Sequence, residues 1–157
     1  MRHMPSILNR DQHNRPGGPL RLHVVLESNM QSINEAASVV IRFAKKHRYG
    51  KQPCHEIELA VREAVANAVL HGNCCDAGKK VFLTAAMQPS GLVVCIRDEG
   101  KGFDPESVPD PLVPGNLMQE SGRGLFLVRA YMDEVIWRPA AEGGMEIWLT
   151  KYPAKRP

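Results

Sequence analysis

The chain has 157 residues, of which 43% are hydrophobic and 24% are charged, and its formal net charge is +3 at pH 7. This length and balance are those of an ordinary one-domain globular protein, and the dispersed positive charge does not favour direct nucleic-acid binding. No apolar stretch approaches the roughly 20 residues that cross a bilayer, and residues 1–19 lack the apolar core of a secretion signal. We therefore expect a cytoplasmic protein with no membrane partner.

The beginning of the chain predicts a tail, a strand and a helix. Residues 1–19 hold prolines and glycines among polar residues, which indicates a flexible tail. Apolar residues alternate with others over residues 20–26, a pattern typical of a strand with one buried face. Ser32, followed three residues later by Glu35, forms a capping-box pattern, so we expect the first helix to begin there and to end at Gly50.

The second predicted helix runs from about Cys54 to Gly72 and has an apolar stripe on one face. That stripe consists of Ile57, Ala60, Val61, Ala64, Val65 and Ala68. The cysteines of the chain show no CxxC spacing, and the grouping of His71, Cys74 and Cys75 fits no common zinc pattern. We expect the cysteines to be reduced thiols.

Three polar residues lie along the edge of this stripe. Glu63, Asn67 and His71 recur every fourth residue, so they line one face of a helix. A carboxylate, an amide and an imidazole beside an apolar stripe are costly to place unless something polar binds there. The alternative is an incidental polar edge, in which Glu63 pairs with Arg62 or Arg129, Asn67 satisfies a loop backbone and His71 caps the helix.

The remainder of the chain predicts a hairpin, a proline-rich loop, a third helix and two more strands. These elements span residues 81–87 and 92–98, 104–115, 124–132, 134–138 and 145–151. The loop is too rich in proline for a helix or a central strand, and loops of this length are commonly functional lids or disordered segments. The order of elements predicts an α+β two-layer sandwich: a mixed, mostly antiparallel sheet with helices on one face. We expect one domain over residues 20–152 and a short tail over 153–157.

Two glycine-containing segments add chemistry to this frame. Residues 98–103 follow a strand, where glycines let the backbone approach a ligand and an Asp can accept a hydrogen bond from an exocyclic amine such as that of adenine. Residues 121–125 open the third helix, whose free N–H groups can hold a phosphate. Each segment alone also fits a plainer interpretation, as a tight turn and as a loop-to-helix junction. Neither fits a dinucleotide-binding or Walker motif.

Taken in order, these segments resemble the motifs of the GHKL ATPase/kinase superfamily, and within it the stand-alone bacterial anti-sigma-factor serine/threonine kinases. The resemblance covers about residues 20–152. The residues that carry it are Glu63, Asn67, His71 and Gly72, then Asp98, Gly100, Gly102 and Phe103, and finally Ser121, Gly122, Gly124 and Leu125 followed by residues 131–135. It implies a histidine-kinase-like ATP-binding domain of the Bergerat type.

The resemblance also implies a role for each matching residue. Asn67 would complete the coordination of Mg²⁺, Glu63 would orient and deprotonate the attacking hydroxyl, and Asp98 would bind the adenine amine. The nucleotide-binding residues that it implies are Asn67, His71, Asp98, Gly100, Gly102, Phe103, Gly122, Arg123, Gly124 and Leu125. Two positions depart from the family pattern: Met145 stands where relatives usually carry Thr, and Glu120 where some carry a basic residue. Arg123 is a candidate source of that positive charge.

From this resemblance we expect an ATP-dependent protein-serine/threonine kinase that requires Mg²⁺. It would act as an anti-sigma factor, binding a sigma factor and phosphorylating a STAS-type anti-sigma-factor antagonist, and it would form a homodimer. The alternative is a non-catalytic ATP-binding switch whose nucleotide state gates a protein–protein interaction. Glu63 favours the kinase, because a binding module has no need of a base at that position.

Overall fold

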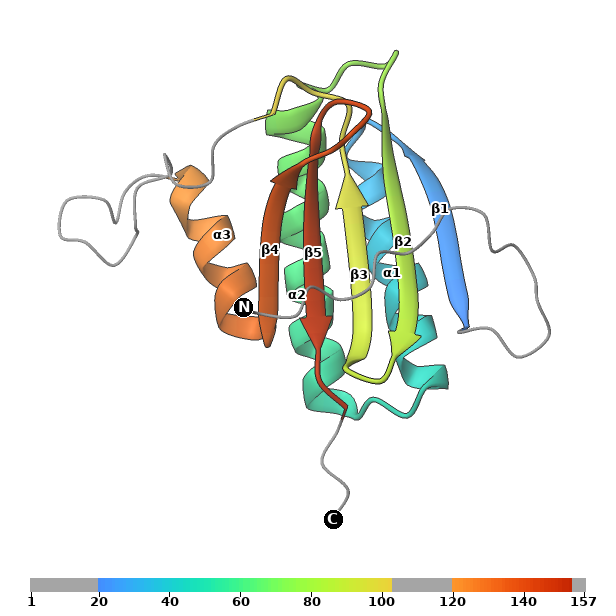
Figure 1. Ribbon diagram of the computed structural model, residues 1–157. Helices are drawn as coiled ribbons and strands as arrows, with labels where there is room; N and C mark the ends of the chain where they lie inside the picture. The colour runs from blue at the N-terminus through green and yellow to red at the C-terminus, as the bar shows by residue number, and fades with distance from the viewer. Residues whose placement is uncertain (1–19, 103–119, 154–157) are drawn as a thin grey trace, which may run out of the picture.

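A computed structural model describes residues 20–102 and 120–153, without the side chains of 120–123. Strands form one five-stranded sheet in the order β1-β2-β3-β5-β4 (Figure 1). The elements are β1 (Arg21–Glu27), α1 (Gln31–Lys46), α2 (Lys51–Asn67), η1 (Ala68–Gly72), β2 (Lys80–Gln88), β3 (Gly91–Arg97), α3 (Glu120–Tyr131), β4 (Glu134–Pro139) and β5 (Met145–Lys151). The predicted tails and the predicted loop over 104–115 lie outside the described residues, apart from Pro153.

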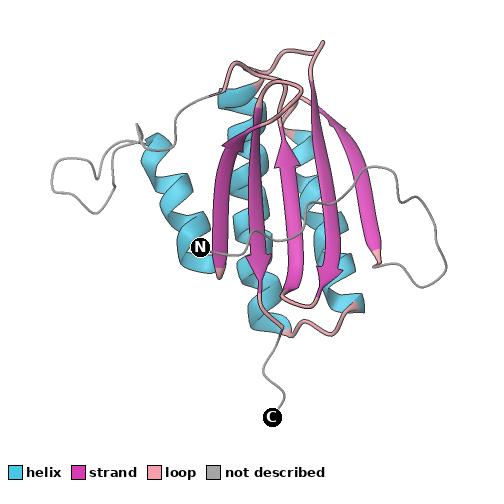
Figure 2. Cartoon of the chain, in the orientation of Figure 1, coloured by secondary structure: helices cyan, strands magenta, loops and turns pink. Residues whose placement is uncertain are grey.

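The described chain forms two layers. Helices α1 and α2 cover one face of the sheet, and α3 packs against α2 beside β4 (Figures 1 and 2). Every neighbouring strand pair is antiparallel. The predicted α+β sandwich is confirmed, and the sheet, which the sequence predicted to be mixed and mostly antiparallel, has only antiparallel pairs among the described strands.

Alternation along the strands explains which face the helices cover. Val24 lies opposite Leu83, Leu83 opposite Ile96, and Ile96 opposite Ile147, so one apolar row crosses four strands. Trp137 extends this row on β4. These side chains belong to the core or pack against it, because side chains at alternate positions point to the same face. The alternating pattern over residues 20–26 therefore predicted the correct buried face, with Leu22, Val24 and Leu26 toward the core.

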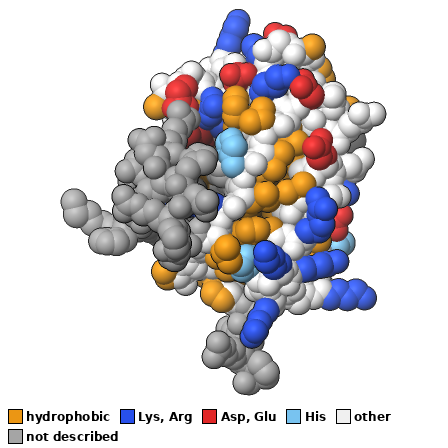
Figure 3. All heavy atoms as spheres, turned by 90° about the vertical axis from the view of Figure 1, so that its right-hand side faces the viewer, with side chains coloured by type: hydrophobic (Ala, Val, Ile, Leu, Met, Phe, Trp, Pro, Cys, Tyr) orange, Lys and Arg blue, Asp and Glu red, His pale blue; other side chains and the backbone are white. Residues whose placement is uncertain are grey.

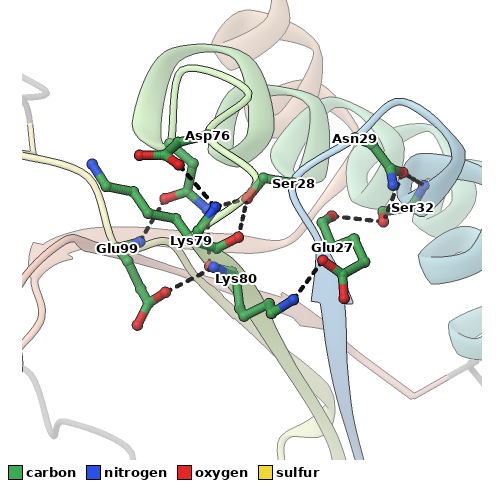
Figure 4. Close-up of polar contacts among 10 residues, drawn as sticks. Glu27, Ser28, Asn29, Ser32, Asp76, Lys79, Lys80 and Glu99 are labelled. Carbon is green, nitrogen blue, oxygen red and sulfur yellow. Dashed lines mark hydrogen bonds and ion pairs between the residues drawn. The ribbon is translucent and has the colours of Figure 1, made fainter.

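The predicted start of the first helix was wrong. Helix α1 begins at Gln31, and its cap residue Met30 makes no side-chain cap bond. Ser32 is buried inside the first turn, where its hydroxyl donates to the carbonyl of Glu27 (2.7 Å) and its N–H donates to Asn29 Oδ1 (3.1 Å). The serine of the capping-box pattern thus ties α1 to the end of β1 (Figure 4).

The predicted stripe of the second helix is confirmed, but the boundaries of that helix differ. Gly50, predicted to end the first helix, is the N-cap of α2, which begins at Lys51. Its α-helical part ends at Asn67 and continues as the π-helical turn η1. The stripe residues Ile57, Ala60, Val61, Ala64, Val65 and Ala68 are all buried. A period of 3.6 residues fits the first part only, because π-turns hold bonds between residues five apart.

The remaining elements lie close to their predicted ranges. The hairpin of β2 and β3 and the last two strands agree with the predicted segments within two residues, while α3 begins at Glu120, four residues before the predicted start. None of the helices in the described part of the chain is both long and apolar enough to cross a membrane.

Candidate functional site

The site is organised around Asp98, the first residue after β3. Its side chain is 5% exposed, and Oδ1 accepts hydrogen bonds from the N–H groups of Gly100 (2.9 Å) and Met145 (3.2 Å). Burial raises the pKa of the Asp98 carboxyl, while these two backbone donors act in the opposite direction. No described residue donates a hydrogen bond to the second oxygen, Oδ2. One oxygen is thus occupied by the protein, and the other remains a free acceptor toward described groups.

Three glycines from separate segments surround this carboxylate. A Cβ on Gly72 would overlap the carboxylate of Asp98, and a Cβ on Gly144 would overlap its backbone carbonyl. A Cβ on Gly100 would overlap the carbonyl oxygen of Gly72. Any side chain at these positions would displace the Asp98 turn, because the atoms it meets are backbone or a held carboxylate. Glycine here allows the end of η1, the β3 exit and the β4–β5 turn to meet.

A pocket opens beside Asp98 between α2 and the sheet. It is lined by Ala64, Asn67, Ala68, Ile96, Asp98, Trp137, Met145 and Ile147. Among these residues, the side chains that can form hydrogen bonds are those of Asn67, Asp98 and Trp137. The remaining walls are apolar. The pocket thus combines apolar walls with a hydrogen-bond acceptor, the carboxylate of Asp98, at one edge.

The polar edge of α2 meets the first turn of α3. A Cβ on Gly124 would lie 2.8 Å from Glu63 Oε2 and 3.7 Å from Asn67 Nδ2. Glu63 and Asn67 are both half-buried, and the side chain of neither makes a hydrogen bond or ion pair with another described residue. Asn67 lines the pocket and Glu63 does not, so the groove edge predicted at Glu63 stays a prediction.

The alternative pairing of Glu63 with an arginine finds no support among the described contacts. Arg62 instead bonds Glu58, one turn earlier on α2, and Asn34 on α1. The guanidinium of Arg129 lies 5.2 Å from the centre of the Trp137 ring. Both cations have other neighbours, so neither pairs with Glu63 among the described contacts.

Other predicted site residues are placed as follows. His71 is exposed, lies in the π-turn and is not among the residues that line the pocket, so its ligand contact stays a prediction. Gly102 has a left-handed φ of +82°, and a Cβ there would lie 3.3 Å from Met145 Sδ. Leu125 is buried at the start of α3. Phe103 and the side chain of Arg123 lie outside the described residues, while Gly122 belongs to the first turn of α3.

Sequence reasoning missed several residues that build the site. Gly144 and Trp137 come from the last two strands and their turn, and Asn73 follows the second helix directly. The double glycine before Met145 was a turn signal, and only the family resemblance, through the position of Met145, connected this turn with the adenine region. Cys74 and Cys75 follow Asn73 as exposed free thiols, and no cluster of three metal-ligating side chains occurs among the described residues.

Comparison with known proteins identifies the family. The chain belongs to the histidine-kinase-like ATPase domain family, whose model matches residues 26–151. It is 34% identical over 102 residues to the anti-sigma F factor of Bacillus subtilis, covering 64% of this chain and 70% of that protein. It is 28% identical over 136 residues to the anti-sigma F factor of Geobacillus kaustophilus, covering 85% of this chain and 93% of that protein.

A solved structure shows the same fold. The crystal structure of the RsbU and RsbW domains of Rv1364c from Mycobacterium tuberculosis matches with a TM-score of 0.62 and 19% sequence identity. The match covers 85% of this chain and 32% of that chain, so this protein spans about a third of its length. At this identity the likeness concerns the fold alone.

Proposed function

We propose that this protein is an ATP-dependent protein-serine/threonine kinase and an anti-sigma factor of a partner-switching system. The family supports ATP as the nucleotide, and relatives named anti-sigma F factor support the regulatory role. The observation that carries the proposal is the carboxylate of Asp98, which lines the pocket and has one oxygen held by two backbone N–H groups and the other without a donor from the described residues.

The carboxylate of Asp98 favours adenine over guanine. Its Oδ1 already accepts two backbone N–H groups, which uses both lone pairs of that oxygen. A single acceptor, Oδ2, remains, and it matches the single exocyclic amine of adenine. The adjacent N1–H and N2–H donors of guanine would call for two acceptors side by side. Apolar walls that include Ile96, Met145 and Ile147 suit the faces of the base.

The polar edge of α2 fits Mg²⁺ and the phosphates. Asn67 lines the pocket and has no described side-chain partner, so its amide oxygen is free for a hard cation. The N–H of Gly122, in the first turn of α3, suits a phosphate oxygen, because helix N-termini favour anions. Gly124 is the fifth residue of this helix, so it would contribute close approach of the backbone and not a free N–H. Mg²⁺ bound with the nucleotide would neutralise charge on the transferred phosphoryl group.

Glu63 is the proposed catalytic base. Its carboxylate lies one helical turn from Asn67 and faces the first turn of α3, where a Cβ on Gly124 would approach Oε2 to 2.8 Å. In the proposed reaction, Glu63 accepts the proton of a serine hydroxyl while that oxygen bonds the γ-phosphorus and ADP leaves. The serine belongs to a STAS-type anti-sigma-factor antagonist, and the second partner is a sigma factor.

The edge strand β1 is the proposed homodimer surface. It lies at the end of the sheet, and Leu20, Val25 and Met30 are 56%, 50% and 57% exposed. Figure 3, which faces the side of the molecule where β1 and α1 lie, shows hydrophobic side chains along this side, with Lys and Arg gathered toward its lower end. An edge strand with exposed apolar residues is a ready surface for a second chain.

Phosphoryl transfer tests the proposal. The wild type, Glu63→Gln and the control Glu58→Gln are incubated with labelled ATP, Mg²⁺ and the STAS-type antagonist. We expect label on an antagonist serine with the wild type and the control, none with Glu63→Gln, and equal ATP affinity for all three. Unaltered transfer by Glu63→Gln would exclude this base. ATP binding with no transfer by the wild type would instead favour the non-catalytic switch.

A further inference from the structure

We infer that Asn73 is a positioning residue for adenine recognition, holding the Asp98 turn in register against the end of η1. This inference rests on the proposed function, because it assigns Asn73 an effect on the nucleotide base through Asp98. Asn73 itself would not touch the ligand.

The side chain of Asn73 is fully buried and uses three hydrogen bonds. Its Nδ2 donates to Ser28 Oγ (2.7 Å) and to the carbonyl of Lys80 (2.9 Å). Its Oδ1 accepts the N–H of Glu99 (2.8 Å). Asn73 is 0% exposed, so the loss of any of these bonds leaves a polar group without water.

This side chain joins three strand ends that are distant in the sequence. Ser28 follows β1, Lys80 begins β2 and Glu99 lies two residues beyond β3. Further bonds close the network: Ser28 Oγ donates to the carbonyl of Lys79 (2.6 Å), and the N–H of Lys80 donates to Glu99 Oε2 (2.7 Å). Figure 4 shows these residues converging at one end of the sheet.

Two covalent neighbours connect this network to the carboxylate. Glu99 follows Asp98 directly. The bond from the Glu99 N–H to Asn73 therefore fixes the peptide group between Asp98 and Glu99. Gly72 precedes Asn73 directly, and its Cα lies against the Asp98 carboxylate so closely that no Cβ fits between them. The N–H of Asn73 also donates to the carbonyl of Ala68 (2.8 Å), which closes η1. Asn73 therefore holds both sides of the contact between Gly72 and Asp98.

The contacts require an amide at this position. Two acceptors, Ser28 Oγ and the carbonyl of Lys80, face one nitrogen, and one donor faces the oxygen. Aspartate would place an acceptor against the Lys80 carbonyl, and alanine would remove all three bonds. A residue that only stabilises the fold would change affinity for all nucleotides alike. A residue that positions Asp98 changes affinity only where the ligand carries the amine that Asp98 reads.

The experiment compares two nucleotides, ATP and purine riboside triphosphate, which lacks the 6-amino group. Equilibrium affinities are measured for the wild type, Asn73→Ala and Asp98→Asn. We expect the wild type to prefer ATP by roughly tenfold or more, the factor that corresponds to about 1.4 kcal/mol. In Asn73→Ala most of that preference is lost, while affinity for the purine analogue changes little. In the double variant with Asp98→Asn, the change at Asn73 has no further effect on the preference.

A matched control removes a buried polar group at the other end of the sheet. Tyr49→Phe deletes a hydroxyl that bonds Leu92 and Lys151, so it destabilises the fold far from Asp98. We expect the preference for ATP to be unchanged in this variant. If Asn73→Ala does not fold, Ser28→Ala and Asn73→Asp are judged by the same criterion.

The outcomes separate the two claims. A wild type without preference for ATP over the purine analogue would contradict the proposed adenine recognition by Asp98. A wild type that has this preference, with Asn73 variants that retain it in full, would overturn the positioning role alone. A preference reduced equally by Tyr49→Phe would also overturn it, because general destabilisation would then explain the effect.

Discussion

The two ends of the sheet carry buried polar groups that are satisfied to different extents. At the end away from Asp98, the Tyr49 hydroxyl accepts from the Leu92 N–H (2.8 Å) and donates to the Lys151 carbonyl (2.7 Å). The ammonium of Lys151 bonds both Glu56 and the carbonyl of Tyr131. In this cluster each polar group that holds the elements together has a partner within the protein.

At the Asp98 end, most of the buried polar groups have hydrogen-bond partners within the protein, but one carboxylate oxygen of Asp98 has no donor among the described residues. The network of Asn73 is closed by Ser28, Lys80 and Glu99, and Oδ1 of Asp98 is held by two N–H groups. Oδ2 of Asp98 has no hydrogen-bond donor among the described residues. A carboxylate oxygen beside a pocket, with no donor from the described residues, is open to a donor on a ligand. This difference is the basis of the predictions that follow.

The largest effect is expected from Gly100→Ala, which would disturb the turn that holds Asp98. Its Cβ would overlap the carbonyl oxygen of Gly72, so the turn or η1 must shift. We expect ATP affinity to fall by more than about tenfold and stability to fall by roughly 1–3 kcal/mol. Isothermal titration and chemical denaturation measure both. The control is Gly50→Ala, whose Cβ would meet only Pro53 Cδ at 4.0 Å, and equal losses in the two variants would contradict the close approach at Gly100.

Tyr49→Phe tests the end of the sheet away from Asp98, where the Tyr49 hydroxyl has two partners. The change leaves the N–H of Leu92 and the carbonyl of Lys151 without their buried partner. We expect a stability loss of about 1–3 kcal/mol with unchanged ATP affinity. Denaturant midpoints and nucleotide titrations provide the two values. A fall in ATP affinity comparable to that of Gly100→Ala would mean that the two ends are not independent.

The pH dependence of binding sharpens the account of Asp98. Burial raises the pKa of this carboxyl, so its contribution to the stability of the ligand-free protein is present below the unfolded pKa and is lost as the pH rises through the folded pKa. Binding of an amine to Oδ2 requires the ionised form. We expect the preference for ATP over purine riboside triphosphate to decline with falling pH, beginning above the ordinary range of an Asp. The ratio cancels phosphate titration, and a ratio that is independent of pH would contradict this role.

The smallest effect is expected from Glu56→Gln. The hydrogen bond from Lys151 holds the pKa of Glu56 below its usual value, so the stabilising contribution of this carboxylate is present above the unfolded pKa and is lost as the pH falls through the folded pKa. A partly exposed pair of this kind contributes about 0–1 kcal/mol. Thermal unfolding at neutral and acidic pH should show a difference between wild type and variant at neutral pH only. ATP affinity should not change.

Periodicity predicted the parts of the molecule that repeat regularly. The apolar stripe of α2 and the alternation over residues 20–26 gave the buried faces of these two elements, because burial acts on every turn and every second strand residue. The order of the elements gave the two-layer architecture. The pattern could not predict the π-turn in which His71 lies. The bond from the Asn73 N–H to the Ala68 carbonyl spans five residues in a single turn, which is too short to show a period in the sequence.

The candidate site was predictable where it follows local motifs and hidden where it depends on long-range contacts. Asp98 and Gly100 stand together in one turn whose chemistry the sequence displays. Gly144 and Asn73 reach that turn only through the pairing of distant segments. The capping-box pattern at Ser32 failed for a local reason, because its hydroxyl bonds the carbonyl of Glu27, five residues earlier.

The most direct test of the central claim is titration of ATP into the wild type and Asp98→Asn. The amide can still accept the N–H groups of Gly100 and Met145, but it presents a donor where Oδ2 accepts. We predict that ATP affinity falls by roughly tenfold or more while stability is retained or raised, because a buried charge is removed. Equal ATP affinity in the folded variant would contradict the account.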